Sequence, residues 1–204
     1  CYYDATNTNL KYVRANDPDG NSWAAPMIID GLTYDAGVTL SLEIINGRPA
    51  IAYHDYTNRD LKYIRANDAN GDSWGTPVTV ESAGDVGLFS SLLDINGRPA
   101  IAYVDPNFGR LKYVRANDAD GTSWPAPIVV AGSFSGSYLS FAVINGNPAI
   151  SHFNNNTFDL RYVRANDADG TSWGALTTLD AANTVGSFNS LAELDGKPAI
   201  SYFD

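Results

Sequence analysis

Four copies of one phrase run through the chain, and each copy closes on a tryptophan. The copies are LKYVRANDPDGNSW, LKYIRANDANGDSW, LKYVRANDADGTSW and LRYVRANDADGTSW, which end on Trp23, Trp74, Trp124 and Trp173. The tryptophans recur about every 50 residues, and a period of this length indicates one supersecondary unit copied in tandem. Residues 1–204 are therefore predicted to form a single repeat array.

Each repeat predicts four short β-strands. In the second repeat these are SLEII at 41–45, AIAYHD at 50–55, LKYIR at 61–65, and a fourth strand that begins at Trp74 and runs through TPVTV. The turn Asn46-Gly47 and its copies favour tight type I′ hairpins, because both residue types accept positive φ. No segment of helical period intervenes. The pattern predicts an all-β propeller with four blade-equivalents of about 50 residues, each with four antiparallel strands.

The two ends of the chain occupy the same place in the repeat. The chain opens on Tyr2-Tyr3-Asp4 and closes on Tyr202-Phe203-Asp204. Strands from the two ends could join as a split blade that closes the ring. Alternatively, the chain is a stretch of a larger ring or is completed by an oligomer. The opening residues contain neither a start methionine nor a leader, so a mature product or a piece of a longer protein is expected.

Charge and composition exclude some partners. The net charge of −10 disfavours nucleic acid and anionic membrane surfaces, which need a basic patch. No apolar run approaches the roughly 20 residues that span a bilayer. Cys1 is the single cysteine, so no internal disulfide forms.

The repeat pattern resembles a known family. SLxxxNGxPAIxYxD followed by LKYVRxND and a tryptophan resembles bacterial extracellular β-propeller repeats over essentially the whole chain. The phrase from Asp118 to Trp124 also resembles the Asp-box hairpin of sialidases, with Gly121 and Ser123 in matching places and the aspartate one residue further away. The resemblance implies a structural role for this hairpin. Sialidase activity is not implied, since the arginine triad and tyrosine nucleophile cannot be placed.

The turns before the tryptophans resemble the start of calcium loops. Calcium prefers six to eight oxygen ligands, often carboxylates. Tight turns favour the same residue types, so turn formation and weak calcium binding both remain open, and no cofactor is required. The candidate calcium ligands are Asp17, Asp19, Asp68, Asp118, Asp120, Asp167 and Asp169.

The repeated aromatic and basic residues have two interpretations each. The tryptophans are predicted to pack between blades, with sugar stacking as the alternative. The arginines two residues after the repeated tyrosines are predicted to pair with turn aspartates such as Asp17 or to stack on aromatics, with a ring of anion-binding arginines as the alternative. These are Arg14, Arg65, Arg115 and Arg164.

Comparison among the copies indicates a candidate binding face. The turns between strands one and two and between strands three and four are nearly invariant, whereas the loops at the other end of the blades diverge. Binding residues tend to lie on loops held by a rigid scaffold, although drift on exposed loops is the alternative. The candidates on this variable face are Tyr34, His54, Arg59, Phe89, Phe108, Arg110, Tyr138, Asn155, Phe158 and Phe188.

Catalytic constellations are not apparent in the sequence. His54 and His152 are the two histidines, and neither belongs to a nucleophile motif or a three-histidine metal site. Asp35, Asp60 and Asp159 are too scattered along the chain to form an evident pair, so no catalytic residue is assigned.

The sequence therefore predicts a non-enzymatic, multivalent carbohydrate-binding module outside the cell or at its surface, with a glycan or surface polysaccharide as partner. The alternatives are a structural or protein-interaction segment, whose partners would be copies of itself or a larger parent chain, and a polysaccharide-acting enzyme.

Overall fold

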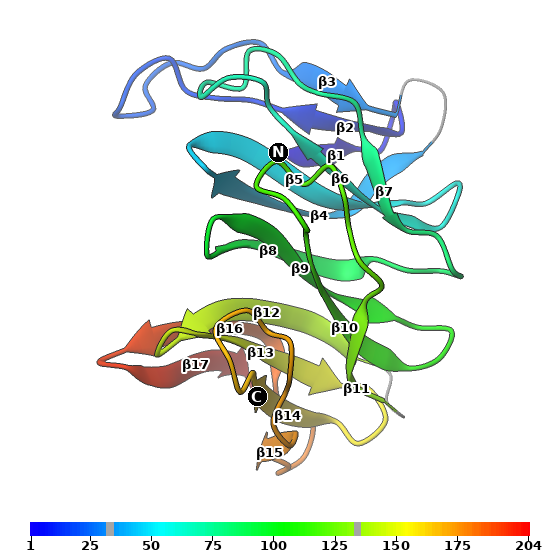
Figure 1. Ribbon diagram of the computed structural model, residues 1–204, viewed down its shortest axis with the longest axis vertical. Helices are drawn as coiled ribbons and strands as arrows, with labels where there is room; N and C mark the ends of the chain where they lie inside the picture. The colour runs from blue at the N-terminus through cyan, green and yellow to red at the C-terminus, as the bar shows by residue number, and fades with distance from the viewer. Residues whose placement is uncertain (32–34, 133–135) are drawn as a thin grey trace.

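The computed structural model describes residues 1–31, 35–132 and 136–204, and the chain is all-β in these ranges (Figure 1). The first sheet holds β1 (Tyr2–Asp4), β2 (Asn9–Tyr12) and β3 (Met27–Asp30). Three four-stranded sheets follow: β4 (Ala36–Ile45), β5 (Arg48–Asp55), β6 (Asp60–Arg65), β7 (Val78–Glu81); β8 (Leu88–Ile95), β9 (Arg98–Asp105), β10 (Arg110–Arg115), β11 (Ile128–Ala131); β12 (Gly136–Ile144), β13 (Asn147–Asn154), β14 (Asp159–Arg164), β15 (Thr177–Asp180). The last sheet holds β16 (Ser187–Leu194) and β17 (Lys197–Phe203).

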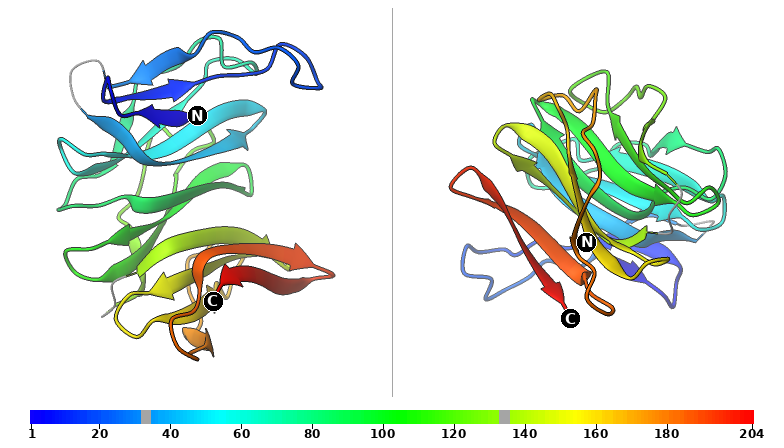
Figure 2. Two further views of the ribbon diagram at one scale, coloured as in Figure 1. Left: turned by 180° about the vertical axis from the view of Figure 1, so that it is seen from behind. Right: turned by 90° about the horizontal axis from the view of Figure 1, so that it is seen from below.

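The sheets are blades stacked side by side. Within each blade every strand pairs antiparallel with the next strand along the chain. The blades follow one another from the N-terminal sheet to the C-terminal sheet, and the first strands β4, β8, β12 and β16 contact in series (Figures 1 and 2). This arrangement confirms the predicted β-propeller fold.

Two predicted strand boundaries are wrong. The first strand of the second repeat begins at Ala36 rather than at residue 41, and it contains a β-bulge between Ala36 and Leu40. The fourth strand begins at Val78, because Trp74 belongs to an isolated bridge with Ala66 rather than to the sheet. A tight turn and a bridge therefore precede the outer strands β3, β7 and β15.

The Asn-Gly turns have the predicted conformation. Asn46 and Gly47 have φ values of 46° and 73°, and the equivalent turns repeat these values closely. Positive φ at both central residues is the type I′ signature, whose twist matches that of the flanking strands.

Neighbouring blades are joined by tyrosine–tryptophan pairs, which confirms the predicted packing role of three tryptophans. The Tyr63 ring of one blade meets the Trp124 ring of the next edge-on, with centroids 5.3 Å apart. Tyr12 with Trp74 and Tyr113 with Trp173 repeat this contact. Trp23 is 59% exposed.

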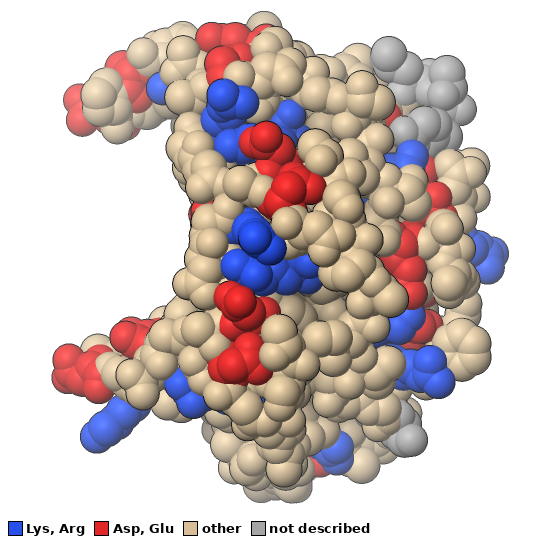
Figure 3. All heavy atoms as spheres, in the orientation of Figure 1, with Lys and Arg blue, Asp and Glu red and all other residues tan. Residues whose placement is uncertain are grey.

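The repeated arginines also join blades, and two of them pair with turn aspartates as predicted, although the aspartate belongs to the next blade. Arg65 forms an ion pair with Asp120 in the turn of the following blade, and Arg115 pairs with Asp169 in the same way. The partner is thus the second aspartate of the next turn rather than the first aspartate of the arginine's own turn. Figure 3 shows basic and acidic side chains alternating down the molecule.

The partial sheets at the two ends remain separate. In the described residues, β16 and β17 form a two-stranded sheet and do not pair with β1, β2 or β3. The split blade proposed from the sequence is therefore not formed in this structure. Most of β17 is exposed, whereas its equivalents β5 and β9 are almost wholly buried.

Within the described residues, the structure contains no helix of the length and apolar character required to cross a membrane.

Candidate functional site

The turn aspartates hold the hairpins together with their carboxylates. Asp68 accepts hydrogen bonds from the backbone N–H groups of Asn70, Asp72 and Ser73 and from the Ser73 hydroxyl, over 2.9–3.1 Å. The N–H of Asp72 contributes most to lowering the pKa of Asp68 to about 2, with burial opposing the shift. Turn formation therefore accounts for this carboxylate. No group of three or more metal-ligating side chains is gathered among the described residues, and calcium binding at these turns stays a prediction.

The predicted ligand residues of the variable face differ in how much of each side chain is exposed. Phe108, Phe158 and Phe188 are 60%, 49% and 70% exposed. The Arg110 guanidinium lies 4.7 Å from the Phe108 ring centroid, so these two residues form one unit. The Asn155 side chain accepts a 2.8 Å hydrogen bond from the Ser137 hydroxyl. Tyr34 lies outside the described residues.

Three aromatic residues of this set form a row across successive blades. The rings of Phe89 and Tyr138 are 6.1 Å apart, and those of Tyr138 and Phe188 are 4.3 Å apart. All three have φ near 50°, and each lies within the bulge of its first strand. Asn189 donates hydrogen bonds to the carbonyl groups of Tyr138 and Gly186, which joins the bulges of adjacent blades.

A second group surrounds a cavity of about 490 Å³ on the same face. The cavity lies among the loops β3–β4, β5–β6 and β7–β8, and of the predicted ligand residues that the structure describes, only Arg59 lines it. Its lining consists of Asp35, Tyr56, Thr57, Arg59 and Asp85.

Backbone hydrogen bonds fix the three loops against one another. The Tyr56 N–H donates to the Asp35 carbonyl at 3.0 Å, and the Asp35 N–H donates to the Thr57 hydroxyl at 2.9 Å. The Val86 N–H donates to the Arg59 carbonyl at 3.1 Å. Arg59 itself has φ of 61°, a strained conformation that side-chain-bearing residues adopt mainly where the surrounding structure imposes it.

Two carboxylates of the cavity lie in contrasting environments. Asp85 Oδ1 is 3.0 Å from Nε2 of His54, and His54 is only 1% exposed. The predicted surface role of His54 is therefore wrong: it is buried and orients Asp85. Asp35 has one buried carboxylate oxygen without a hydrogen-bond partner, and its side chain is hydrogen-bonded to the Tyr3 phenol, which raises the pKa of Tyr3.

The carboxylate pair breaks the symmetry of the repeats. Asp35 and Asp85 lie 50 residues apart at equivalent places before the first strands of neighbouring blades, whereas the last repeat has Thr184 there. The sequence prediction did not pair Asp35 with Asp85. The signal that could have found this pair is that two adjacent repeats both have an aspartate two residues before the glycine at the start of the first strand.

A third carboxyl group, that of Asp60, follows a lining residue in the chain but does not itself line the cavity. Asp60 follows Arg59 and pairs across the strands with Asp55. Burial, followed by the charge of Asp55, raises the pKa of Asp60, so it holds a proton more readily than an ordinary aspartic acid. An arginine and carboxylates around one cavity can orient hydroxylated or anionic groups and can transfer protons.

Comparisons with known proteins identify the fold. No protein-family model matches the sequence, and no curated protein matches it significantly. Among solved structures, the leech intramolecular trans-sialidase has a TM-score of 0.65 at 19% identity, covering 92% of this chain and 32% of its own. The α-L-arabinofuranosidase from Lactobacillus brevis has a TM-score of 0.56 at 14% identity, covering 88% of this chain and 70% of its own. The exo-β-1,3-galactanase from Phanerochaete chrysosporium also has a TM-score of 0.56, at 13% identity, covering 78% of this chain and 40% of its own.

The chain spans about a third of the length of the trans-sialidase. These neighbours are enzymes that act on glycans, and this finding contradicts the prediction of a non-enzymatic binding module. At these identities the likeness establishes the fold of the chain, a β-propeller.

Proposed function

We propose that the protein acts on glycosidic bonds of a glycan and that the chemistry takes place in the cavity between Asp35 and Asp85. The observation that carries the proposal is the convergence of these two carboxylates, from neighbouring blades, on one cavity with Arg59. Enzymes that hydrolyse glycosides commonly use a pair of carboxyl groups flanking the scissile bond, one as acid and the other as base or nucleophile.

The surroundings give each residue a distinct part in this proposal. His54 fixes the orientation of the Asp85 carboxylate, which then faces the substrate as base or nucleophile. Asp35 lines the other part of the cavity, where its carboxyl group would face the glycosidic oxygen. The exposed side chains of Tyr56 and Arg59 can bind the sugar ring and its hydroxyl groups.

We also propose an extracellular or cell-surface location and Asp-box-like hairpins. The resemblance of the repeats to extracellular propellers supports the location. The hairpin proposal is supported by Asp118, which accepts backbone hydrogen bonds within its turn, and by Trp124, whose indole N–H donates to the Gly121 carbonyl at 2.8 Å.

The proposal is tested by measuring reducing-end release from a panel of plant, fungal and sialylated glycans. Asp35→Asn and Asp85→Asn should each lower the rate by about 100-fold or more, since positioned acid–base groups contribute about that factor. Asp19→Asn, in a turn at the opposite end of the blades, should retain the wild-type rate. The melting temperature of all three variants should match that of the wild type. If Asp35→Asn and Asp85→Asn both turn over substrate at the wild-type rate, the assignment is refuted.

A further inference from the structure

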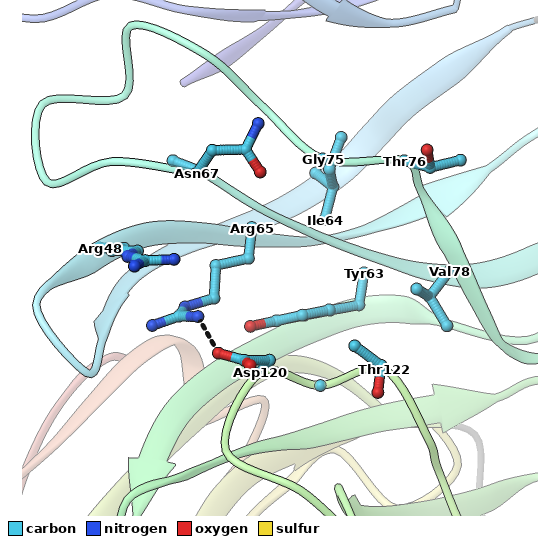
Figure 4. A pocket seen from close by; sticks show the side chains of 12 residues that line it. Arg48, Tyr63, Ile64, Arg65, Asn67, Gly75, Thr76, Val78, Asp120 and Thr122 are labelled. Carbon is cyan, nitrogen blue, oxygen red and sulfur yellow. Dashed lines mark hydrogen bonds and ion pairs between the residues drawn. The ribbon is translucent and has the colours of Figure 1, made fainter.

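A second polar pocket lies at the opposite end of the blades, beside the invariant turns. It has a volume of about 260 Å³ and is formed between the blades β4–β7 and β8–β11. Its polar lining comes from Arg48, Tyr63, Arg65, Asn67, Asp120 and Thr122, among others (Figure 4). We call it the inter-blade pocket. It does not share residues with the Asp35–Asp85 cavity.

The Tyr63 hydroxyl is buried in this pocket without a hydrogen-bond partner. Tyr63 is 1% exposed, and Figure 4 shows its hydroxyl directed toward Arg65 and Asp120. The equivalent Tyr113 hydroxyl donates to the Asp169 carbonyl at 2.8 Å, and that of Tyr12 donates to the Asn70 carbonyl at 3.1 Å. Buried polar groups are rarely left unsatisfied, so an unpaired hydroxyl in the lining of a pocket indicates a missing hydrogen-bond partner. Burial raises the pKa of Tyr63, which keeps the hydroxyl protonated and able to donate.

The two arginines of the pocket differ in how they are engaged. The Arg65 guanidinium donates to the Ile45 carbonyl at 2.9 and 3.1 Å and forms an ion pair with Asp120. These two opposite charges offset each other. Arg48 is exposed, and within the described part of the chain its guanidinium makes no hydrogen bond or ion pair. The inter-blade pocket therefore has one uncompensated positive charge from its own lining.

Sequence differences set this pocket apart from its copies. Thr76 lines it, whereas the equivalent positions hold Ala25, Ala126 and Ala175. Arg48 is matched by Arg98 in the next copy, but there the tyrosine hydroxyl is already bonded. The free guanidinium, the unpaired hydroxyl and the threonine thus occur together in one copy.

We propose that the inter-blade pocket binds a carboxylate carried by a small hydroxylated molecule. The Arg48 guanidinium pairs with the carboxylate, because guanidinium geometry matches carboxylate oxygens. The Tyr63 hydroxyl donates a hydrogen bond to the same ligand, and Asn67, Thr76 and Thr122 provide partners for hydroxyl groups. The volume suits a ligand of about the size of one sugar acid, since drug-sized ligands occupy larger pockets.

The test is an NMR titration of the whole chain with sodium D-glucuronate, sodium acetate and D-glucose. Glucuronate should produce saturable shifts around Arg48 and Tyr63, and glucose, its neutral match, should not. Arg48→Ala should weaken glucuronate binding at least about tenfold, and Tyr63→Phe, which keeps the ring, should weaken it severalfold. Arg98→Ala is the matched control and should leave these shifts unchanged.

Each outcome decides the proposal. Binding of glucuronate but not acetate supports a sugar acid as ligand, and equal binding of both supports the carboxylate while removing the role of the hydroxyl groups. No saturable shift with either carboxylate, equal binding of glucose, or full binding by Arg48→Ala would overturn the proposal. None of these results depends on glycosidase activity, so the two proposals fail separately.

Discussion

At the scale of single residues, carboxylates in this chain have two kinds of environment. Those in the repeated turns accept several backbone hydrogen bonds, as Asp68 does. Asp35 and Asp85 lie in a cavity, where one has a buried oxygen without a partner and the other is oriented by a buried histidine. Residue type alone does not distinguish the two kinds, because both are aspartates with a glycine two or three residues further along the chain. Their hydrogen-bond partners do.

The turn carboxylates should make the fold sensitive to acid. The N–H groups of Asn21 and Ser22 lower the pKa of Asp17. For Asp118 and Asp167, burial acts to raise the pKa, but the hydrogen bonds of the turn outweigh burial and the pKa is lowered. A carboxyl with a lowered folded-state pKa stabilises the fold above its unfolded pKa and loses this contribution as pH falls through the folded value. The melting temperature should therefore fall as the pH drops from about 4 to about 2.

Substitutions distinguish protonation of the turn carboxylates from other causes of acid unfolding. Asp68→Asn should reduce the dependence of the melting temperature on pH, because the variant lacks one group that must be protonated. Asp19→Asn should leave the pH dependence of the melting temperature unchanged. In the described residues Asp19 contributes its backbone N–H to the turn, and its carboxylate accepts no hydrogen bond. A melting temperature that stays flat between pH 5 and pH 2.5 would contradict this account.

At the scale of the elements, the turns and bulges decide how the blades are shaped and spaced. The strands and the Asn-Gly hairpins could be predicted from the sequence because both depend on local preferences. The bulges that carry Phe89, Tyr138 and Phe188 could not, because a bulge depends on the register of two paired strands. The outer strand was misplaced for a similar reason: Trp74 packs on the preceding blade, so its aromatic character did not mark a strand.

Two glycines with the same backbone conformation allow the cost of backbone strain in a turn to be compared with the cost of a clash between blades. Gly47 and Gly170 both have φ of 73°, but an added Cβ at Gly47 meets nothing within 4 Å, whereas one at Gly170 lies 2.6 Å from Cε1 of Tyr113 in the neighbouring blade. Gly47→Ala should cost about 1–2 kcal/mol of unfolding free energy, from the left-handed backbone alone. Gly170→Ala should cost about 1–3 kcal/mol more, because the tyrosine must move. Denaturant unfolding measures both, and equal losses would show that blade contacts at Gly170 are not tightly packed.

At the scale of the whole molecule, the propeller has two faces, one at each end of its strands. The invariant turns lie at one end, where arginine–aspartate pairs and tyrosine–tryptophan contacts join the blades. The divergent loops lie at the other end and hold the Asp35–Asp85 cavity. The repeat period was sufficient to predict this division. It could not predict that Asp35 and Asp85 converge, because their proximity depends on the rotation between adjacent blades and on the hydrogen bonds of the loop between them.

The most direct test of the proposed glycan-acting site is a crystal structure of Asp85→Asn with an oligosaccharide of the substrate identified by reducing-end release. The account predicts a sugar ring in the cavity, with a glycosidic oxygen near the Asp35 carboxylate and with Arg59 and Tyr56 in contact with the sugar. Oligosaccharide bound solely at the invariant turns, or at the aromatic row without entering the cavity, would contradict it.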